Sequence, residues 1–248
     1  MEVLLGLLIG FAIGATGIGG GTLAAPAMIL LLGFSPRVAI ATALVFSAIV
    51  KIGASGIYLW RKQVNFRALG YLLVGGVPGV LLGALLFAEL HITKSDSWIP
   101  VVVGLFIIIS AGSSLFRFSR LNVQGKSMFH LLPLFSLPIG LETGFSSAGA
   151  GALSSIVLLN VTDLSAASVV GTDLVFGMIT AATGGTIHAF HGNCDWMALA
   201  LLLPAGFVGT VAGAHFARAL PSRQIRAALL CWIIFVGFLL IHSGLQQP

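Results

Sequence analysis

Charged residues are scarce in this sequence. They make up 8% of the 248 residues, whereas hydrophobic residues make up 58%. A water-soluble domain carries about 25% charged residues, so this composition excludes a soluble protein and predicts an integral membrane protein. The twelve Lys and Arg residues are scattered through hydrophobic sequence. They form no basic face of the kind that binds nucleic acid.

Cysteine is also scarce, and the two cysteines, Cys194 and Cys231, lack the spacing of a metal or redox motif. We therefore expect no metal and no other cofactor. The opening stretch MEVLLGLLIG lacks the positively charged segment that begins a cleavable signal peptide. We expect the first hydrophobic segment to remain part of the protein.

Glycine, in contrast, is concentrated. The stretch GATGIGGGTLAAP at residues 14–26 has five glycines within eight residues. It fits no nucleotide-binding loop, because Gly20 stands where a P-loop has its lysine and Thr22 stands where a dinucleotide fingerprint has its last glycine. Two interpretations stay open: the glycines present backbone N–H groups to an anion, or they only allow helices to pack closely.

The chain repeats itself. A shift of about 130 residues aligns about 80 positions without gaps, with roughly a quarter of them identical. The glycines at positions 10, 14, 19 and 21 fall on those at 140, 144, 149 and 151, and TALVF at 42–46 falls on TDLVF at 172–176. We predict a first membrane repeat at residues 1–120, a cytoplasmic linker at 121–128 and a second membrane repeat at 129–248.

The charge pattern predicts that the two repeats are inverted. Basic residues cluster at 61–67, 117–126 and 218–226, and the positive-inside rule places these segments in the cytoplasm. The loop HGNCDW at 191–196 has no Lys or Arg, so we expect it outside. The basic loop at 61–67 is the repeat equivalent of this loop, which lacks Lys and Arg. Equivalent loops are therefore expected on opposite sides of the membrane, as in inverted-repeat transporters.

Opposite polarity requires an odd number of membrane crossings in each repeat. The first hydrophobic blocks, 3–32 and 129–160, exceed the roughly 20 residues that cross a bilayer, and glycines divide both. We predict an all-α polytopic membrane protein in which each inverted repeat is a re-entrant helical hairpin plus three transmembrane helices, with both termini outside. The two glycine turns are expected to meet near the membrane midplane.

Ionisable residues at membrane depth are candidates for function. Lys51 and Asp173 each lie ten residues from a charged helix end, so we expect both near the midplane. Either they form a structural ion pair, or Lys51 contacts an anion and Asp173 carries a proton. Glu142 is a second proton-carrying candidate. Thr42 and Thr172, expected near the middle of their helices, either contact the ligand or bond back to their own helix.

The motifs together resemble the sulfite exporter TauE/SafE family, the four-toluene-sulfonate-uptake type of permease. The resemblance lies in the glycine-rich stretch at 17–33, in ATALVF at 41–46, in GTDLVF at 171–176 and in the segment 188–214. It covers essentially the whole chain and implies a multi-pass permease of the plasma membrane (the bacterial inner membrane) for sulfite, organosulfonates or related anions. Tyr58 departs from the family, which we expect to have a histidine matching His188, and Lys51 is unusual in its helix.

We therefore predict a transporter that exports small sulfur-containing anions by alternating access. We expect no enzyme, because GFSSA at 144–148 fits no serine-hydrolase motif; an intramembrane hydrolase is the weaker alternative and a passive anion channel the stronger. The expected partners are the anion and membrane lipid, and a homodimer is compatible with the sequence. The predicted anion-binding residues are Gly19, Gly20, Gly21, Thr22, Thr42, Lys51, Ser146, Ser147, Gly149, Gly151 and Thr172.

Overall fold

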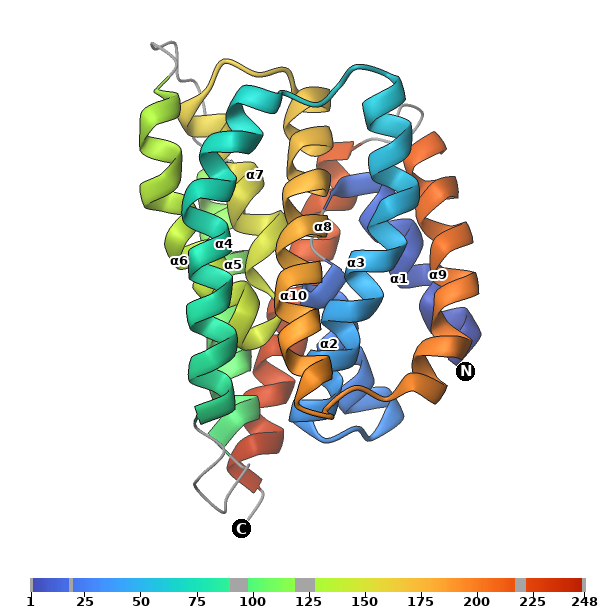
Figure 1. Ribbon diagram of the computed structural model, residues 1–248. Helices are drawn as coiled ribbons and strands as arrows, with labels where there is room; N and C mark the ends of the chain where they lie inside the picture. Colours follow the sequence, from blue (N-terminus) through green and yellow to red (C-terminus); the bar gives the residue numbers. More distant parts are fainter. Residues whose placement is uncertain (1, 18–19, 90–97, 119–127, 217–221, 247–248) are drawn as a thin grey trace.

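The computed structural model describes residues 2–17, 20–89, 98–118, 128–216 and 222–246, and the regular secondary structure in these ranges is entirely helical (Figure 1). The helices are α1 (Glu2–Thr16), α2 (Gly20–Leu32), α3 (Pro36–Trp60), α4 (Phe66–Glu89), α5 (Trp98–Phe118), α6 (Leu132–Ser146), α7 (Gly149–Val161), α8 (Ala166–Phe190), α9 (Trp196–Phe216) and α10 (Ser222–Gln246), and a 3-10 turn, η2 (Phe129–Leu131), precedes α6.

Four of the helices in the described ranges, α3, α4, α8 and α9, are long and apolar enough to cross a membrane. The predicted all-α, polytopic membrane class is therefore confirmed. Helices α5 and α10, with 21 and 25 residues, have the length of a membrane-crossing helix, but six full crossings stay a prediction.

The first hydrophobic block of each half consists of two short helices, as the sequence predicts. Helix α1 ends at Thr16, and Gly17 follows with φ 71°. Helix α6 ends at Ser146, and Ser147 follows with φ 67°, a left-handed conformation that is uncommon for a serine. A chain that leaves the right-handed helical region in this way cannot continue the helix, so both blocks break at their glycine-rich turns.

Glycines hold two helix pairs in close contact. Helix α1 packs along α9, and α6 packs along α4. The partner's backbone occupies the place that a Cβ atom would need at each of these glycines: Gly6 faces Leu202, Gly10 faces Gly206 and Gly14 faces Thr210, while Gly75 faces Pro133, Gly79 faces Leu137 and Gly83 faces Leu141. In each pair, the residue numbers of the two helices increase in the same direction along the contact, so the helices run parallel. Gly75, Gly79 and Gly83 thus form the side of α4 that packs against the backbone of α6.

The centre of the molecule is an antiparallel contact between α3 and α8. Lys51 lies against Gly177, and Val45 lies against Gly185. In Figure 1, α3 rises from the bottom of the view to the top, and α8 descends beside it. The α3–α4 turn therefore lies at the top and the α8–α9 turn at the bottom. The α1–α2 pair begins and ends at the bottom of the view, whereas α6–α7 begins and ends at the top.

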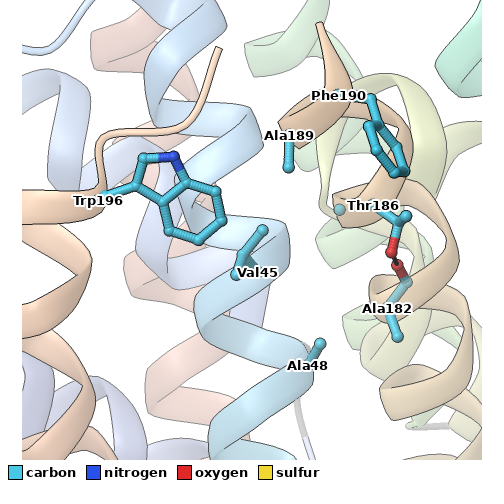
Figure 2. Close-up of a pocket in the computed structure, with 8 residues that line it drawn as sticks. Val45, Ala48, Ala182, Thr186, Ala189, Phe190 and Trp196 are labelled. Carbon is cyan, nitrogen blue, oxygen red and sulfur yellow. Dashed lines mark hydrogen bonds between the residues drawn. The ribbon is translucent and has the colours of Figure 1, made fainter. Parts of the chain in front are cut away.

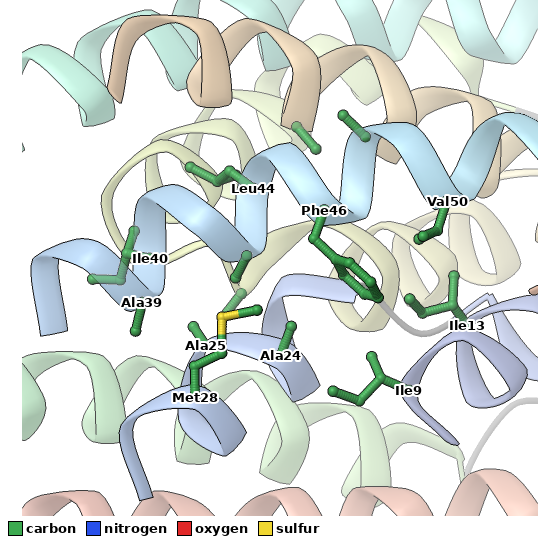
Figure 3. Close-up of a cluster of buried hydrophobic side chains, with 14 of the residues drawn as sticks. Ile9, Ile13, Ala24, Ala25, Met28, Ala39, Ile40, Leu44, Phe46 and Val50 are labelled. Atoms are coloured by element: carbon green, nitrogen blue, oxygen red, sulfur yellow. The ribbon is translucent and has the colours of Figure 1, made fainter. Parts of the chain in front are cut away.

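The largest buried apolar cluster joins α1, α2 and α3 (Figure 3). Ile13, Met28, Leu44 and Phe46 are fully buried in it. Lipid tails are as apolar as these side chains, so tight van der Waals packing stabilises such a core inside a membrane.

Exposed aromatic residues mark both ends of the bundle. Trp60 ends α3 with 85% of its surface exposed, and Phe190 ends α8 with 87% exposed. Phe66 and Trp196 begin α4 and α9 and are also exposed. Tryptophan, as at Trp60 and Trp196, is enriched at the two membrane–water interfaces. Each of the two turns, α3–α4 and α8–α9, is therefore flanked by exposed aromatic residues.

Candidate functional site

The two glycine-rich turns contact each other. The hydroxyl of Thr22 donates a hydrogen bond to the backbone carbonyl oxygen of Ala148, 2.7 Å away. Gly21 lies directly against Ser147, so that a Cβ atom at position 21 would overlap the serine. The first turn of α2 therefore packs on the turn between α6 and α7. Gly19, which we expected in the same turn, lies outside the described residues.

The two serines of the second turn differ in their bonding. The Ser146 hydroxyl donates to the Glu142 carbonyl oxygen at 2.9 Å and accepts from the Ala148 N–H at 3.3 Å. The Ser147 hydroxyl is buried and has no hydrogen-bond partner among the described residues. A buried hydroxyl without a partner is unfavourable by about 1–3 kcal/mol. Ser147 is therefore the serine of this turn that has a free hydrogen-bonding group to offer a ligand.

One face of α3 carries a buried polar stripe next to these turns. Ser47, Lys51 and Ser55 follow one another at intervals of four residues, which places them on the same side of a helix. All three are at most 2% exposed. Ser47 lies against Gly20, and the Lys51 ammonium nitrogen lies against Gly177 of α8. The Ser55 hydroxyl is the second buried hydroxyl in the described ranges that has no partner.

Asp173 on α8 is fully buried and receives hydrogen bonds from two hydroxyl groups of α7. Ser154 donates to its Oδ1, and Ser155 donates to its Oδ2 at 2.6 Å. Ser154 also accepts the N–H of Gly151 at 2.8 Å. Gly151 has φ 115°, which breaks α7 just after its start and frees this N–H from the helical pattern. The expected glycine turn thus continues into the residues that hold Asp173.

Lys51 and Asp173 act on each other electrostatically, since the carboxylate attracts the ammonium group. The sequence placed both residues at membrane depth but missed Ser154 and Ser155. The signal was present, because a Ser-Ser pair follows the second glycine turn and the same helix must pack on α8. The repeat comparison hides it, since the equivalent residues of the first half are Ala24 and Ala25.

Thr42 and Thr172 have a structural task that the sequence did not reveal. The Thr42 hydroxyl oxygen accepts the N–H of Asp195 at 3.0 Å, and the Thr172 hydroxyl oxygen accepts the N–H of Asn65 at 2.9 Å. Each threonine is the seventh residue of its helix, not near the middle as expected. Each one ties its helix to the loop that precedes a helix of the other half.

Asp195 and Asn65 in turn start those helices. The Asp195 side chain accepts the N–H groups of Met197 and Ala198, and the Asn65 side chain accepts the N–H of Ala68. These are helix-capping bonds of the usual kind. Cys194 lies beside Asp195, where burial raises the pKa of its thiol and a hydrogen bond with Thr42 partly opposes that rise.

Glu142 and His188 lie at another contact between the halves. His188 Nε2 is 2.9 Å from the carbonyl oxygen of Gly144. Its ring packs edge-on against Phe87, and the Arg37 guanidinium lies over the same phenylalanine. Glu142 is buried half a turn before Gly144. In the first half, Tyr58 replaces the histidine and its ring lies against Gly171.

A separate pocket of about 420 Å³ lies between α3 and α8 (Figure 2). Its walls are apolar except for Thr186, whose hydroxyl is bonded to the Ala182 carbonyl oxygen at 2.7 Å. The lining residues are Val45, Ala48, Ala182, Gly185, Thr186, Ala189, Phe190 and Trp196. Without a charged lining residue, this pocket does not suit an anion, whereas the polar cluster around Lys51 does.

Sequence comparisons find relatives that are named probable membrane transporter proteins. The probable membrane transporter protein YjnA of Bacillus subtilis (strain 168) is 28% identical over 251 residues, which cover 96% of this chain and 98% of YjnA. The probable membrane transporter protein YunE of the same organism is 21% identical over 269 residues, covering 98% and 97%. The probable membrane transporter protein MamO of Paramagnetospirillum magneticum (strain ATCC 700264 / AMB-1) is 22% identical, and the match covers 97% of this chain but 44% of MamO.

No solved structure matches this chain. The family model for the sulfite exporter TauE/SafE matches residues 3–240, nearly the whole chain. With its apolar membrane-crossing helices, this chain is a multi-pass membrane transporter and belongs to the sulfite exporter TauE/SafE family.

Proposed function

We propose that this protein exports small sulfur-containing anions, such as sulfite or organosulfonates, and that the anion binds at Lys51 between the two glycine-rich turns. The observation that carries the proposal is the buried Lys51 ammonium group on the face of α3 that also holds Ser55, a buried hydroxyl without a partner among the described residues. A second such hydroxyl, Ser147, lies in the second glycine-rich turn, against Gly21. A buried cation with free donors around it matches the needs of an oxyanion. The family supports the transporter class. We propose no enzymatic activity.

The glycine turns add backbone donors to this site. Helix α2 begins at Gly20, and its first N–H groups have no partner inside the helix. Such helix starts attract anions. The proposed binding residues are those expected from the sequence: Gly19, Gly20, Gly21, Thr22, Lys51, Ser146, Ser147, Gly149 and Gly151. Thr42 and Thr172 remain proposed contacts, each with one hydrogen bond already assigned to a loop amide.

We also propose that the halves are inverted repeats joined by the linker at 121–128. The packing supports this, because equivalent pairs (α1 with α9, α6 with α4) form equivalent contacts. Residues 49–50 of α3 lie opposite residues 179–180 of α8, and these same positions are repeat equivalents of each other. Lys51 lies about 2 Å along the helix from that level, at 1.5 Å per residue. A lysine near the symmetry level is accessible in turn from either side as the halves rock.

Asp173 and Glu142 are the proposed proton carriers. Both carboxylates are buried, at 0% and 6% exposure.

A homodimer is proposed as well, and its test is the mass of the purified protein–detergent complex by light scattering.

Flux measurements in proteoliposomes test the function. We expect saturable transport of thiosulfate, methanesulfonate or sulfite, and acceleration of labelled-anion exchange by unlabelled anion on the opposite side. Exchange of that kind distinguishes alternating access from a passive channel. Lys51→Met should abolish the flux, and Lys62→Met, a change at the exposed α3–α4 turn, should not. Equal flux in protein-free liposomes would contradict the proposal.

A further inference from the structure

The buried polar cluster is already electrically balanced without an anion. Lys51 supplies one positive charge, and its ammonium nitrogen lies against Gly177, one helical turn after Asp173 on the same side of α8. The Asp173 carboxylate supplies the negative charge that balances it. Within the described ranges, the elements around Asp173 carry few other polar or charged side chains. Helix α7 contributes the hydroxyls of Ser154 and Ser155. The other charged or titratable residues on the packed elements are Tyr58 and Arg37 on α3, Arg67, Tyr71 and the exposed Glu89 on α4, Glu142 on α6 and His188 on α8.

None of these others balances the Lys51 site. Arg67 lies over the ring of Phe129. Arg37 lies over Phe87, at the end of α8 where His188 contacts Gly144. Glu142 belongs to that same end of the bundle. Asp173 is the carboxylate whose charge acts on Lys51.

An anion that joins a neutral pair leaves one uncompensated negative charge in a buried site, which is strongly unfavourable. We infer that each anion bound at Lys51 is accompanied by one proton, taken up from water by the Asp173 carboxylate. This inference rests on the proposed function. The step breaks one O–H bond of a hydronium ion in the surrounding water, forms one O–H bond on Asp173 and breaks no bond in the protein. For a monovalent anion, the net charge of the site is zero before and after binding.

Ser154 and Ser155 suit an acid that changes its charge. A hydroxyl donates to a carboxylate and can accept from a protonated carboxyl group after rotation. Ser154 is held in place by the N–H of Gly151, 2.8 Å away. The two serines of α7 are therefore positioning residues that hold the Asp173 side chain of α8 in both of its charge states. The first half cannot take up this proton, because Ala24, Ala25 and Ala43 stand at the equivalent positions.

Calorimetry on the purified full chain tests the inference with methanesulfonate and ethanesulfonate, two monovalent anions whose charges stay fixed near neutral pH. Titrations in two buffers of different ionisation enthalpy give the number of protons taken up. We expect about one proton per anion in the wild type. Asp173→Asn should bind the anion with no proton uptake. Asp163→Asn, at an exposed carboxylate ten residues earlier, is the matched control and should keep the wild-type value.

The pH dependence of the affinity tests the role of the serines. Because binding requires a protonated Asp173, the wild-type affinity should fall about tenfold per pH unit above the pH at which Asp173 loses its proton. Ser154→Ala with Ser155→Ala removes two donors to the charged form, so this fall should begin at higher pH. Asp173→Asn should have a flat profile. A purely structural role would lower the melting temperature and leave the profile unmoved.

The outcomes separate the two proposals. Anion binding by the wild type without proton uptake overturns the inference and leaves the proposed function standing. Proton uptake that persists in Asp173→Asn also overturns it, and assigns the proton to another group. Absence of binding for both anions contradicts the proposed function and the inference together.

Discussion

The hydroxyl of Thr22 donates a hydrogen bond to the backbone carbonyl oxygen of Ala148, 2.7 Å away in space and 126 residues away in sequence. This bond joins the first turn of α2 to the turn between α6 and α7. It fixes the two glycine-rich turns against each other beside Lys51. The candidate site is therefore assembled by contacts between the halves of the chain.

Thr22→Val should destabilise the protein by about 1–3 kcal/mol, because the Ala148 carbonyl oxygen loses a buried donor. Thr22→Ser keeps the hydroxyl and should be close to wild type. Thr183→Val is the matched control, since that hydroxyl bonds to the Ile179 carbonyl oxygen of its own helix. Thermal unfolding in detergent measures all three. Equal melting temperatures for Thr22→Val and Thr183→Val would contradict the importance of this bond.

Lys51→Met should leave a membrane-inserted protein that does not transport. The single change strands the Asp173 carboxylate, which typically destabilises by 3–5 kcal/mol, so folding is checked by gel filtration. Lys51→Met with Asp173→Asn removes both charges and should regain stability without regaining flux. Full flux in this double variant would show that the lysine serves only as an ion-pair partner.

Gly79→Ala should lower the melting temperature, because its Cβ atom would meet the backbone carbonyl of Leu137 on α6. Gly70→Ala is the control on the same helix, since nothing lies within 4 Å of the added atom. That control should be neutral or slightly stabilising, as alanine is the better helix former by about 1 kcal/mol. If both variants melt alike, close packing of α4 on α6 is not a source of stability.

Thr42→Val and Thr172→Val should each lower the melting temperature, because the N–H groups of Asp195 and Asn65 lose their acceptors. We expect a loss of about 1–2 kcal/mol each. Anion affinity is measured on the same samples by calorimetry. A raised Kd supports the predicted ligand contact; an unchanged Kd in both variants removes these two threonines from the binding site.

Labelling from the two sides of the membrane tests the inverted repeats. Cys194 in the α8–α9 turn should react with an impermeant maleimide from outside, and Gln63→Cys in the α3–α4 turn (in a chain with Cys194→Ser and Cys231→Ser) from the cytoplasm. Burial raises the pKa of the Cys194 thiol, so less thiolate is present at neutral pH and its labelling should accelerate as pH rises. Reaction of both positions from the same side would rule out inverted repeats.

The sequence by itself determined the membrane class, because a chain with 8% charged residues cannot cover itself with water-compatible surface. It also determined where the first blocks break, since clusters of glycine at 14–21 and 144–151 interrupt both of them. The close packing of Gly75, Gly79 and Gly83 was also predictable, because small residues at four-residue spacing lie on one side of a helix and let another helix approach it closely.

Only the tertiary structure decided which polar groups meet. Ser154 and Ser155 bond to Asp173 because α7 packs on α8, and no local pattern in the sequence encodes that contact. Thr42 and Thr172 looked like paired ligand contacts, yet each hydroxyl accepts a loop amide from the other half. A side chain's periodicity determines which face of its helix it occupies, whereas its hydrogen-bond partner depends on the helix that packs there.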